Sequence, residues 1–247
     1  MIRWSTIGAD VLDLLFPRTC PACQAADGLD ADGLCGHCRD ELADGFRRNY
    51  CRRCGSTVGP YATGDGRCPA CRGFFWPVAG VVRLGMHQGV LRDLLLELKY
   101  GGRDELDRFF GRRLAEVLTG ASWFEEVEAL TAVPTYWRRH LFGRAYVATA
   151  LARELGRATG LPDPALLRRV RGGPSQIGLT RAQRVKNVRG AFGLARGVKL
   201  NGAVVCLVDD VTTTGATLLE CARILKRAGA AKVFAAVVCK QHGLGSQ

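Results

Sequence analysis

One stretch near the C-terminus, Val205–Thr217, restricts the fold of this chain more than any other. It reads Val-Cys-Leu-Val-Asp-Asp-Val-Thr-Thr-Thr-Gly-Ala-Thr. Its first four residues are apolar and include two valines, which is typical of a buried parallel strand. A helical pattern of apolar residues follows, with Gly229 in position to end it. A buried strand followed directly by a helix predicts an α/β domain with an open parallel sheet.

Two kinds of polar residue separate this strand from its helix. Asp209 and Asp210 follow the expected end of the strand, and the threonine–glycine loop, Thr212–Thr217, contains four threonines and Gly215. Ligands of open α/β sheets bind at the carboxyl ends of the strands, where a helix N-terminus offers free N–H groups. The loop suits a phosphate, and the acids suit sugar hydroxyls or a magnesium ion. Together they describe a site for a ribose 5-phosphate.

The thirteen residues resemble the phosphoribosyl diphosphate (PRPP) motif of type I phosphoribosyltransferases. They do not form a Walker A loop, because no Gly-Lys-Ser/Thr follows the strand. The alternative is an ordinary strand–turn–helix with a threonine N-cap and solvated acids.

Eight of the eleven cysteines fall in four Cys-x-x-Cys pairs. The pairs are Cys20/Cys23, Cys35/Cys38, Cys51/Cys54 and Cys68/Cys71. Each pair is half of a tetrahedral four-cysteine zinc site, so we expect two structural zinc ions. The segment has few large aliphatic residues, and zinc binding of roughly 10–16 kcal/mol per structural site would supply the stability that its core lacks. Disulfides are the rival interpretation. Consecutive pairs sharing a metal is the simplest arrangement, and a cross-braced one is the alternative.

The positive charge is concentrated in one part of the chain. The formal net charge is +12, and residues 134–200 carry fourteen Lys and Arg against two acids, whereas the rest of the chain is close to balanced. Such a block suits a polyanionic ligand, either a diphosphate or a nucleic acid. Arg47, Arg48, Arg52 and Arg53 beside the third cysteine pair are further candidates for phosphate contact, with a solvated surface as the alternative.

The sequence predicts a cytoplasmic protein. The first sixteen residues contain Asp10 and Asp13, and Pro17-Arg18-Thr19 is not a small-residue cleavage site. No apolar run approaches the roughly eighteen residues that span a bilayer. In the cytoplasm thiols stay reduced, which favours metal binding over disulfides.

The periodicity predicts two domains, residues 1–77 and 78–247. The first holds a short helix that ends at Pro17 and the cysteine pairs, and Phe74-Phe75-Trp76-Pro77 is expected to dock it on the second. In the second, strands are expected at 79–84, 129–133, 166–170, 191–194, 203–208 and 233–239. Helices are expected around 91–98, 106–118, 145–157 and after the threonine–glycine loop, with a polar helix or loop at 180–187. This alternation predicts a parallel, doubly wound sheet.

The order of motifs resembles the ComF (competence protein F) family over nearly the whole chain. The matching positions are Leu12–Pro17 before the cysteine pairs, Leu98-Lys99-Tyr100-x-Gly102, Val133-Pro134, Arg169-x-Arg171, Gln176, Leu179, Arg184, Asn187-Val188, Ala191-Phe192 and Val208–Thr217. The resemblance implies a double zinc ribbon on a type I phosphoribosyltransferase domain. It also implies a link, in some bacteria, to natural transformation and to handling of single-stranded DNA.

The resemblance also implies roles for individual residues. Asp209 and Asp210 would hold the ribose hydroxyls, directly or through magnesium. The 5-phosphate would be held by Thr213, Thr214, Gly215, Ala216 and Thr217, and Thr212 would also belong to the substrate site. The loop that receives the diphosphate would be Val133-Pro134-Thr135-Tyr136, with Arg138 and Arg139 behind it. Arg184 and Asn187 would lie on a loop that closes over PRPP, and Lys99 would contact phosphate.

One departure from the family pattern concerns catalysis. The family often shows Arg-Gly-Phe-Asn-Gln after the proline loop, whereas this chain reads Gly143-Arg144-Ala145-Tyr146-Val147. The Asn-Gln pair, which would add donors to the site, is absent. The sequence therefore supports ligand binding more directly than catalysis.

Two functions remain open from the sequence. The first is a pentosyltransferase that displaces diphosphate from PRPP, with Asp209, Asp210 and Arg184 as catalytic residues, an acceptor that the sequence does not specify and a possible role in DNA uptake. The second is a non-catalytic PRPP sensor that binds single-stranded DNA or a protein of the DNA-uptake machinery. Diphosphate release in the presence of candidate nucleophiles separates the two.

Overall fold

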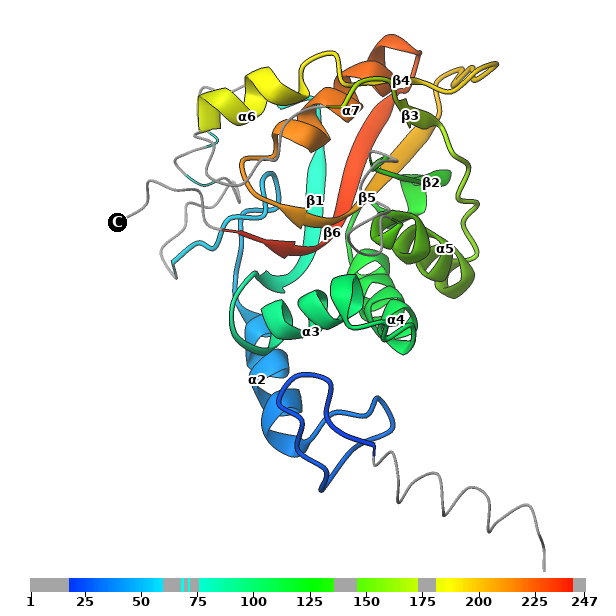
Figure 1. The fold of residues 1–247 in the computed structure, drawn as a ribbon. Helices are drawn as coiled ribbons and strands as arrows, with labels where there is room; N and C mark the ends of the chain where they lie inside the picture. Colours follow the sequence, from blue (N-terminus) through cyan, green and yellow to red (C-terminus); the bar gives the residue numbers. More distant parts are fainter. Residues whose placement is uncertain are drawn as a thin grey trace, which may run out of the picture.

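The computed structural model describes residues 18–59, 68, 71, 76–135, 146–172 and 181–241. The predicted helix before Pro17 and residues Tyr136, Arg138, Arg139, Gln176 and Leu179 lie outside these ranges. The helices are α2 (Gly36–Arg47), α3 (Gly89–Tyr100), α4 (Glu105–Thr119), η2 (Phe124–Glu126), α5 (Val147–Thr159), α6 (Arg181–Val188) and α7 (Ala216–Arg227). The strands are β1 (Gly80–Met86), β2 (Ala129–Ala132), β3 (Leu167–Arg169), β4 (Phe192–Leu194), β5 (Val204–Thr212) and β6 (Lys232–Lys240). Figure 1 shows their arrangement.

Four strands form one parallel sheet in the order β1-β6-β5-β2. The predicted parallel sheet is therefore confirmed for these strands. Because all four run in the same direction, their carboxyl ends meet at one edge, where an open α/β sheet binds its ligands. The end of β5 lies between the ends of β6 and β2 at this edge.

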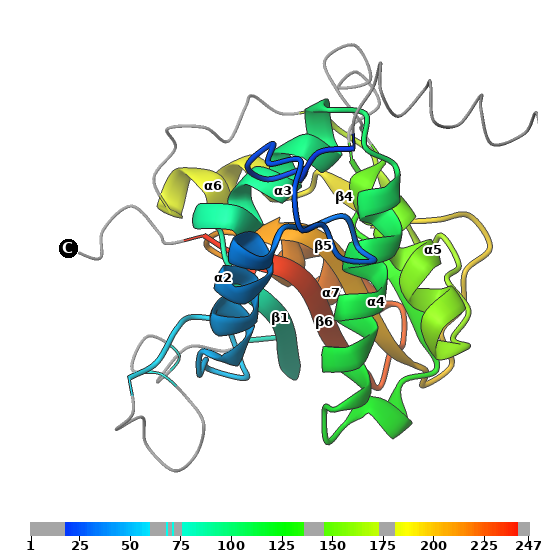
Figure 2. The ribbon, with the colours of Figure 1, turned by 90° about the horizontal axis from the view of Figure 1, so that it is seen from below.

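Alternation along β5 assigns its side chains to two faces of the sheet. Cys206 and Val208 are buried in a cluster with α3, α4 and α5, whereas Val205 and Leu207 are buried in a cluster with α7. Figures 1 and 2 show α3, α4 and α5 on one side of the sheet and α7 on the other. Continuing the alternation, Asp210 follows Val208 toward α3, and Asp209 follows Leu207 toward α7.

Two expectations about the strands are wrong. β3 and β4 do not join the parallel sheet, because they pair with each other as a separate antiparallel sheet with Leu167 opposite Leu194. Each has three residues, and Phe192 of β4 packs in the α7 cluster. β5 also does not end before the two acids. Its pairing with β6 continues to Thr212 opposite Lys240, so the backbone of both acids is held inside a sheet.

The two cysteine-rich segments attach to the sheet domain at different places. Helix α2, in the first segment, packs on β1 and α3, and Oε1 of Glu41 accepts the N–H of Val90 at the start of α3 (2.9 Å). In the second segment, the carbonyl of Arg52 accepts the N–H of Val81 (2.6 Å). This bond covers the free edge of β1, which is the outermost strand on its side of the sheet.

None of the helices in the described ranges combines the length and the apolar character needed to cross a bilayer.

Candidate functional site: two four-cysteine clusters and the carboxyl edge of the sheet

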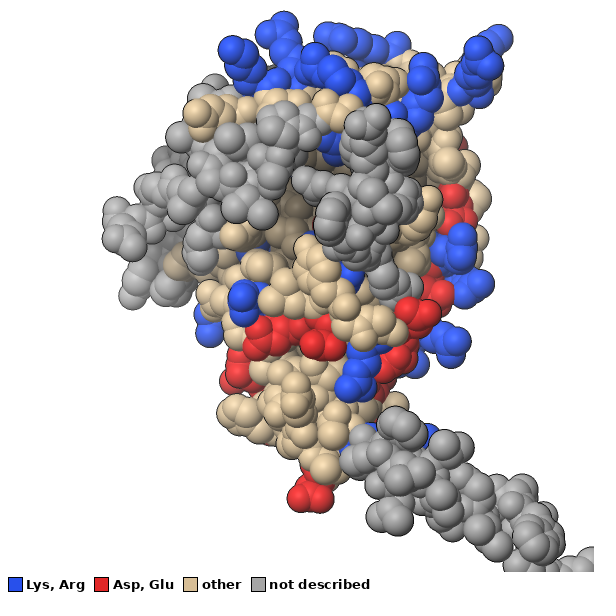
Figure 3. Space-filling model, in the orientation of Figure 1, with Lys and Arg blue, Asp and Glu red and all other residues tan. Residues whose placement is uncertain are grey.

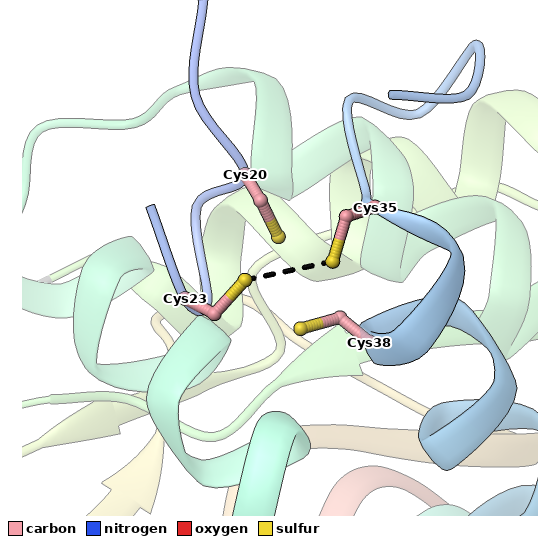
Figure 4. A group of neighbouring side chains, drawn as sticks. All are labelled: Cys20, Cys23, Cys35 and Cys38. Carbon is pink, nitrogen blue, oxygen red and sulfur yellow. Dashed lines mark hydrogen bonds between the residues drawn. The ribbon is translucent and has the colours of Figure 1, made fainter. Parts of the chain in front are cut away.

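The first four-cysteine cluster joins a loop to the start of α2. Cys20 and Cys23 come from the loop, Cys35 is the N-cap of α2, and Cys38 lies in its first turn. The four sulfur atoms lie within 4.8 Å of one another, and Sγ of Cys23 is 3.5 Å from Sγ of Cys35. Figure 4 shows the four thiols pointing toward a common centre.

The second cluster has the same composition and is built from loops. It contains Cys51, Cys54, Cys68 and Cys71, again within 4.8 Å of one another. Sγ of Cys54 lies 3.6 Å from Sγ of Cys68, and Sγ of Cys51 lies 3.9 Å from Sγ of Cys71. The backbone N–H of Cys68 donates to Sγ of Cys51 (3.3 Å).

These sulfur separations fit a tetrahedral zinc ion. A Zn–S bond of about 2.3 Å places two sulfur ligands about 3.8 Å apart, close to the observed 3.5–3.9 Å. Consecutive pairs share each cluster, so the cross-braced arrangement is wrong. Burial acts to raise the pKa of Cys20, but backbone N–H groups of Cys35 and Cys23 outweigh it and lower that pKa to about 6. A thiol with so low a pKa is readily available as the thiolate that binds metal.

The two acids of β5 meet Lys99 at the carboxyl edge of the sheet. Lys99 lies in the last turn of α3, and its Nζ is 2.5 Å from Oδ2 of Asp210. The side chains of Lys99 and Asp210 are 24% and 20% exposed, so the pair is accessible from one side only. Oδ1 of Asp209 accepts the N–H of Asp210 (3.0 Å), which orients the first carboxylate. The sequence placed Lys99 at a phosphate, whereas its partner in the structure is Asp210.

The pKa values of the two acids are shifted in opposite directions. Burial raises the pKa of Asp209 well above its ordinary value, and the charge of Asp210 raises it further. Burial also acts to raise the pKa of Asp210, but the Lys99 ammonium outweighs burial and lowers it. The pKa of Lys99 is raised, because the attraction of Asp210 exceeds the effect of burial. Lys99 thus favours the ionised form of Asp210, whereas burial and the neighbouring charge favour the protonated form of Asp209.

The threonine–glycine loop is held by β6 at its first two residues. Nζ of Lys240 donates to the carbonyl oxygen of Thr213, and the N–H of Gln241 donates to that of Thr212 (2.8 Å). Gly215 has φ 77°, a left-handed conformation that favours glycine, and it is the N-cap of α7. Because glycine has no side chain, the N-cap residue itself leaves N–H groups of the first helical turn available to an anion.

Several predicted residues come to this same edge. Pro134 and Thr135 follow β2, whose Ala132 pairs with Val208, so they lie beside the end of β5. Ala216 and Thr217 form the first turn of α7, and Oγ1 of Thr214 accepts the N–H of Ala216 (3.3 Å). Asn187 and the backbone of Arg184 lie on α6, which packs on α7 rather than against the acids, and the side chain of Arg184 is outside the described part of the structure.

The sequence did not point to three residues around this edge. Lys240, at the end of β6, donates a hydrogen bond to the loop. The signal in the sequence that could have indicated this residue is a charge at the end of an otherwise apolar strand. His87 follows β1, and its pKa is lowered by burial and by the charges of Lys99 and Arg92. Of the segment Phe74-Phe75-Trp76-Pro77 that was expected to dock the ribbons, Trp76 packs between the second cluster and Leu219 of α7, and Phe74 and Phe75 lie outside the described residues. The contact of Trp76 with Gly215 was not foreseen. A carbon added to Gly215 would lie 2.9 Å from Cζ3 of the Trp76 ring.

A basic surface covers α6, the β3–β4 pair and the end of α7. Its exposed residues are Arg168, Arg171, Lys186, Arg189, Arg196, Lys199, Arg223, Lys226 and Arg227. Figure 3 shows Lys and Arg side chains gathered along the corresponding side of the molecule, with acids grouped lower down. Six of the fourteen Lys and Arg of residues 134–200 thus lie on this surface, together with three from α7.

Comparison with known proteins agrees with both parts of this structure. A double zinc ribbon domain model matches residues 11–72, and a phosphoribosyl transferase domain model matches residues 145–245. Competence protein F of Haemophilus influenzae is 30% identical over 230 residues, which cover 88% of this chain and 95% of that protein. The chain belongs to the competence protein F family.

Other relatives extend this assignment. DNA utilization protein YhgH of Salmonella typhi is 29% identical over 92% of this chain and 99% of that protein. Adenine phosphoribosyltransferase of Mycolicibacterium paratuberculosis is 34% identical over 132 residues, covering 50% of this chain and 72% of that enzyme. This member of the competence protein F family is therefore a phosphoribosyltransferase-fold protein with an N-terminal double zinc ribbon. Its relatives are named for competence and for DNA utilization. The segment with β1, α3 and Lys99 lies outside both domain models.

Proposed function

We propose that this protein binds PRPP with Mg²⁺ at the carboxyl edge of its sheet and presents it for transfer of phosphoribose to an acceptor. One observation carries the proposal. The carboxylate pair of β5 and the glycine N-cap of α7 lie a few residues apart on one rigid strand–loop–helix unit, with Lys99 ion-paired to Asp210. Ribose 5-phosphate likewise carries a phosphate group at one end and a vicinal diol at the other.

Each part of the edge has a role in this proposal. The threonine–glycine loop and the first turn of α7 bind the 5-phosphate through N–H and hydroxyl donors. Asp209 and Asp210 bind the ribose hydroxyls, directly or through Mg²⁺, which prefers carboxylate oxygens. Pro134 and Thr135 begin the loop that receives the diphosphate. Arg184 and Asn187 belong to the segment that closes over the ligand.

The reaction would be a displacement at the anomeric carbon of PRPP. The bond from C1 to the diphosphate oxygen breaks, the diphosphate leaves with the bonding electrons, and the acceptor forms the new bond to C1 and releases its proton. Basic side chains would stabilise the charge that develops on the leaving group, and Mg²⁺ held by the acids would supply further positive charge there. The relationship to an adenine phosphoribosyltransferase supports this chemistry.

Calorimetric titration with PRPP, with and without Mg²⁺, tests the proposal. Asp209→Asn and Asp210→Asn should each weaken binding roughly tenfold to a hundredfold, because hydrogen bonds to charged groups contribute about 1.5–3 kcal/mol. Asp93→Asn is the matched control, since Asp93 is on α3, pairs with Arg92 and is 45% exposed. Unchanged affinity in the Asp209→Asn, Asp210→Asn double variant would rule out this site. Diphosphate release with candidate nucleophiles then separates a transferase from a sensor.

A second candidate function is favoured by the basic surface. It is a PRPP sensor that binds single-stranded DNA, in which ligand binding occurs without turnover. The nine exposed Lys and Arg exceed what one diphosphate needs, and they lie on α6, β3–β4 and α7 rather than at the acids.

Fluorescence anisotropy of a labelled oligonucleotide tests this candidate. Binding should persist with saturating PRPP, and log K against log salt should have a slope near −0.7 for each phosphate neutralised. Lys226→Gln with Arg227→Gln should reduce the magnitude of that slope. Absence of binding at low salt, or complete competition by PRPP, would exclude a separate DNA surface.

A further inference from the structure

The indole of Trp76 lies directly behind the threonine–glycine loop. Its ring atoms Cζ3 and Cη2 are 2.9 and 3.0 Å from the position that a side-chain carbon on Gly215 would take. Trp76 is 7% exposed, so this contact is part of the protein interior. The left-handed φ of Gly215 and the nearby ring both restrict this position to glycine.

The same indole packs in the interior of the second ribbon, the segment that contains Cys51, Cys54, Cys68 and Cys71. Trp76, the four cysteines of the second cluster and Leu219 of α7 form one apolar cluster, with Val58 at its margin. The N–H of Leu219 donates to the carbonyl of Gly215 (2.9 Å) in the first turn of α7. The second ribbon therefore contacts the loop and the start of the helix that follows it, and Trp76 makes the contact with the loop.

The part of the second ribbon that the structure describes has a small apolar core. Within the described residues its apolar cluster contains one aromatic ring and one leucine apart from the cysteines and Val58. A segment with so small a core depends on its metal ion for stability.

A buried arginine of β1 lies beside the second ribbon. Arg83 of β1 is 1% exposed, donates to Oγ1 of Thr57 (3.2 Å) and lies 4.7 Å from the ring centre of Tyr50. Its Nε and Nη1 have no hydrogen-bond partner within the described part of the chain. A zinc ion with four thiolates carries a net charge of −2 and would compensate this cation. With metal lost and thiols protonated, a buried charge is left without an opposite charge, which is costly.

We propose that Trp76 is a positioning residue for the threonine–glycine loop, and that metal bound by Cys51, Cys54, Cys68 and Cys71 keeps it in place. Metal binding at the second ribbon and phosphate binding at Gly215 then favour each other. The inference rests on the proposed function in taking a 5-phosphate as the ligand of the loop. Because coupling between two sites is reciprocal, the ligand also slows metal loss from the second ribbon. The first ribbon, which has no such contact with the loop in the described residues, is not coupled in this way.

The test measures metal retention at each ribbon separately in the full-length, zinc-loaded protein. The protein is incubated with a chelator and a thiol-alkylating reagent, with or without PRPP and excess Mg²⁺, and alkylation of each cysteine is followed by mass spectrometry. PRPP should slow alkylation of the second cluster by about fivefold or more, the lower limit of typical coupling between sites. Alkylation of Cys20, Cys23, Cys35 and Cys38 should change by less than about twofold.

Two tryptophan variants complete the test. Trp76→Leu should weaken PRPP binding about tenfold, a loss of about 1.4 kcal/mol, and should abolish the protection of the second cluster. Trp76→Phe, which keeps a ring behind Gly215, should restore most of both effects. Trp123→Leu is the matched control. Trp123 stacks on Phe234 near the amino end of β6 (ring centres 4.0 Å apart), so this variant should bind PRPP like the wild type.

The outcomes distinguish this inference from the proposed function. One outcome is that PRPP binds normally, in a way that depends on Asp209 and Asp210, yet changes alkylation of the two clusters equally and binds Trp76→Leu as tightly as the wild type. That result would overturn the inference and leave the PRPP site standing. Absence of PRPP binding in the wild-type protein would overturn the proposed function, and the inference with it.

Discussion

The two zinc-ribbon segments have the same pairs of cysteines and different surroundings. Cys20, Cys35 and Cys38 are buried in the same apolar cluster as α3, α4 and one face of the sheet, together with Leu34 and Leu42. The second ribbon forms a small cluster of its own, which reaches the rest of the molecule through Trp76 and Leu219. One repeated motif thus packs in the main core in one copy and beside the threonine–glycine loop in the other.

Each ribbon supports a different side of the carboxyl edge. The first holds α2, whose Glu41 accepts a hydrogen bond from the N-terminal turn of α3, and α3 carries Lys99 to Asp210 at its other end. The second places Trp76 behind Gly215. The second ribbon therefore contacts the threonine–glycine loop directly, whereas the first ribbon contacts α3 at the end opposite to Lys99.

The largest difference between the ribbons is expected when one metal ligand is removed from each. Cys38→Ser should lose the first metal and, because Cys38 packs in the main core, should abolish cooperative unfolding of the sheet domain. Cys54→Ser should unfold only the second ribbon and leave the sheet folded. Zinc binding of about 10–16 kcal/mol per site sets the scale of both effects.

Elemental analysis and circular dichroism melting measure these effects. The wild-type protein should contain two zinc ions per chain, one for each cluster, and Cys54→Ser should contain one. Equal losses of melting temperature in the two variants would contradict the difference between the ribbons. Near-zero metal, with the cysteines oxidised in pairs, would contradict zinc binding altogether.

The side of the edge supported by the first ribbon is tested by Lys99→Met. Removing the ammonium leaves Asp210 without its ion-pair partner, and Mg²⁺–PRPP binding should weaken roughly tenfold to a hundredfold, given about 1.5–3 kcal/mol for a charged hydrogen bond. Zinc content should not change. Lys232→Met is the control, because Lys232 is at the amino end of β6 and pairs with Glu126. Calorimetry with equal affinities for both variants would remove Lys99 from the site.

The raised pKa of Asp209 predicts that both stability and Mg²⁺–PRPP affinity depend on pH through this carboxyl group. Its pKa is higher in the folded than in the unfolded protein, so the stability that it contributes is present below the unfolded pKa and is lost as pH rises through the folded one. Mg²⁺–PRPP needs the ionised carboxylate, so its affinity should rise over the same range and binding should release protons.

Calorimetry in buffers of different ionisation enthalpy measures this proton release. Asp209→Asn should abolish it, whereas Trp76→Leu, which acts on the other side of the edge, should retain it. If the wild-type protein took up protons on binding Mg²⁺–PRPP, the raised pKa of Asp209 would not be the source of the pH dependence.

The smallest effect is expected from the contact between α2 and α3. Glu41→Ala removes the acceptor for the N–H of Val90 and should reduce the free energy of unfolding by about 1 kcal/mol. PRPP affinity should change less than in Trp76→Leu, since α3 is also held by Leu94, Leu95 and Leu98 in the core. Asp40→Ala, an exposed change on the same helix, is the control. A larger loss of affinity in Glu41→Ala than in Trp76→Leu would reverse the roles of the ribbons.

Local patterns predicted most of the elements and the composition of the metal clusters. Apolar periodicity located β1, α3, α4, β5, α7 and β6, and Cys-x-x-Cys spacing identified all eight cysteines of the clusters. These features depend on neighbouring residues in the chain. The division into domains of residues 1–77 and 78–247 stays a prediction. The cysteines of the first ribbon share one apolar cluster with the sheet domain, so packing alone does not mark a boundary between the two.

Contacts between distant segments could not be predicted in the same way. The extension of β5 through Asp210 depends on the length of β6, and the pairing of β3 with β4 depends on their packing against α7. Trp76 and Gly215 are far apart in sequence, so nothing in either local pattern indicates their contact. Arg83 did carry a signal, since a charge inside the apolar run Val81–Leu84 requires a partner from elsewhere.

A crystal structure of the zinc-loaded protein with PRPP and Mg²⁺ tests the central claim most directly. We expect the 5-phosphate in the threonine–glycine loop, against the N-terminus of α7 and in front of Trp76. We expect the ribose hydroxyls at Asp209 and Asp210, directly or through Mg²⁺. PRPP bound elsewhere, or an empty carboxyl edge at a PRPP concentration that saturates binding in solution, would contradict this claim.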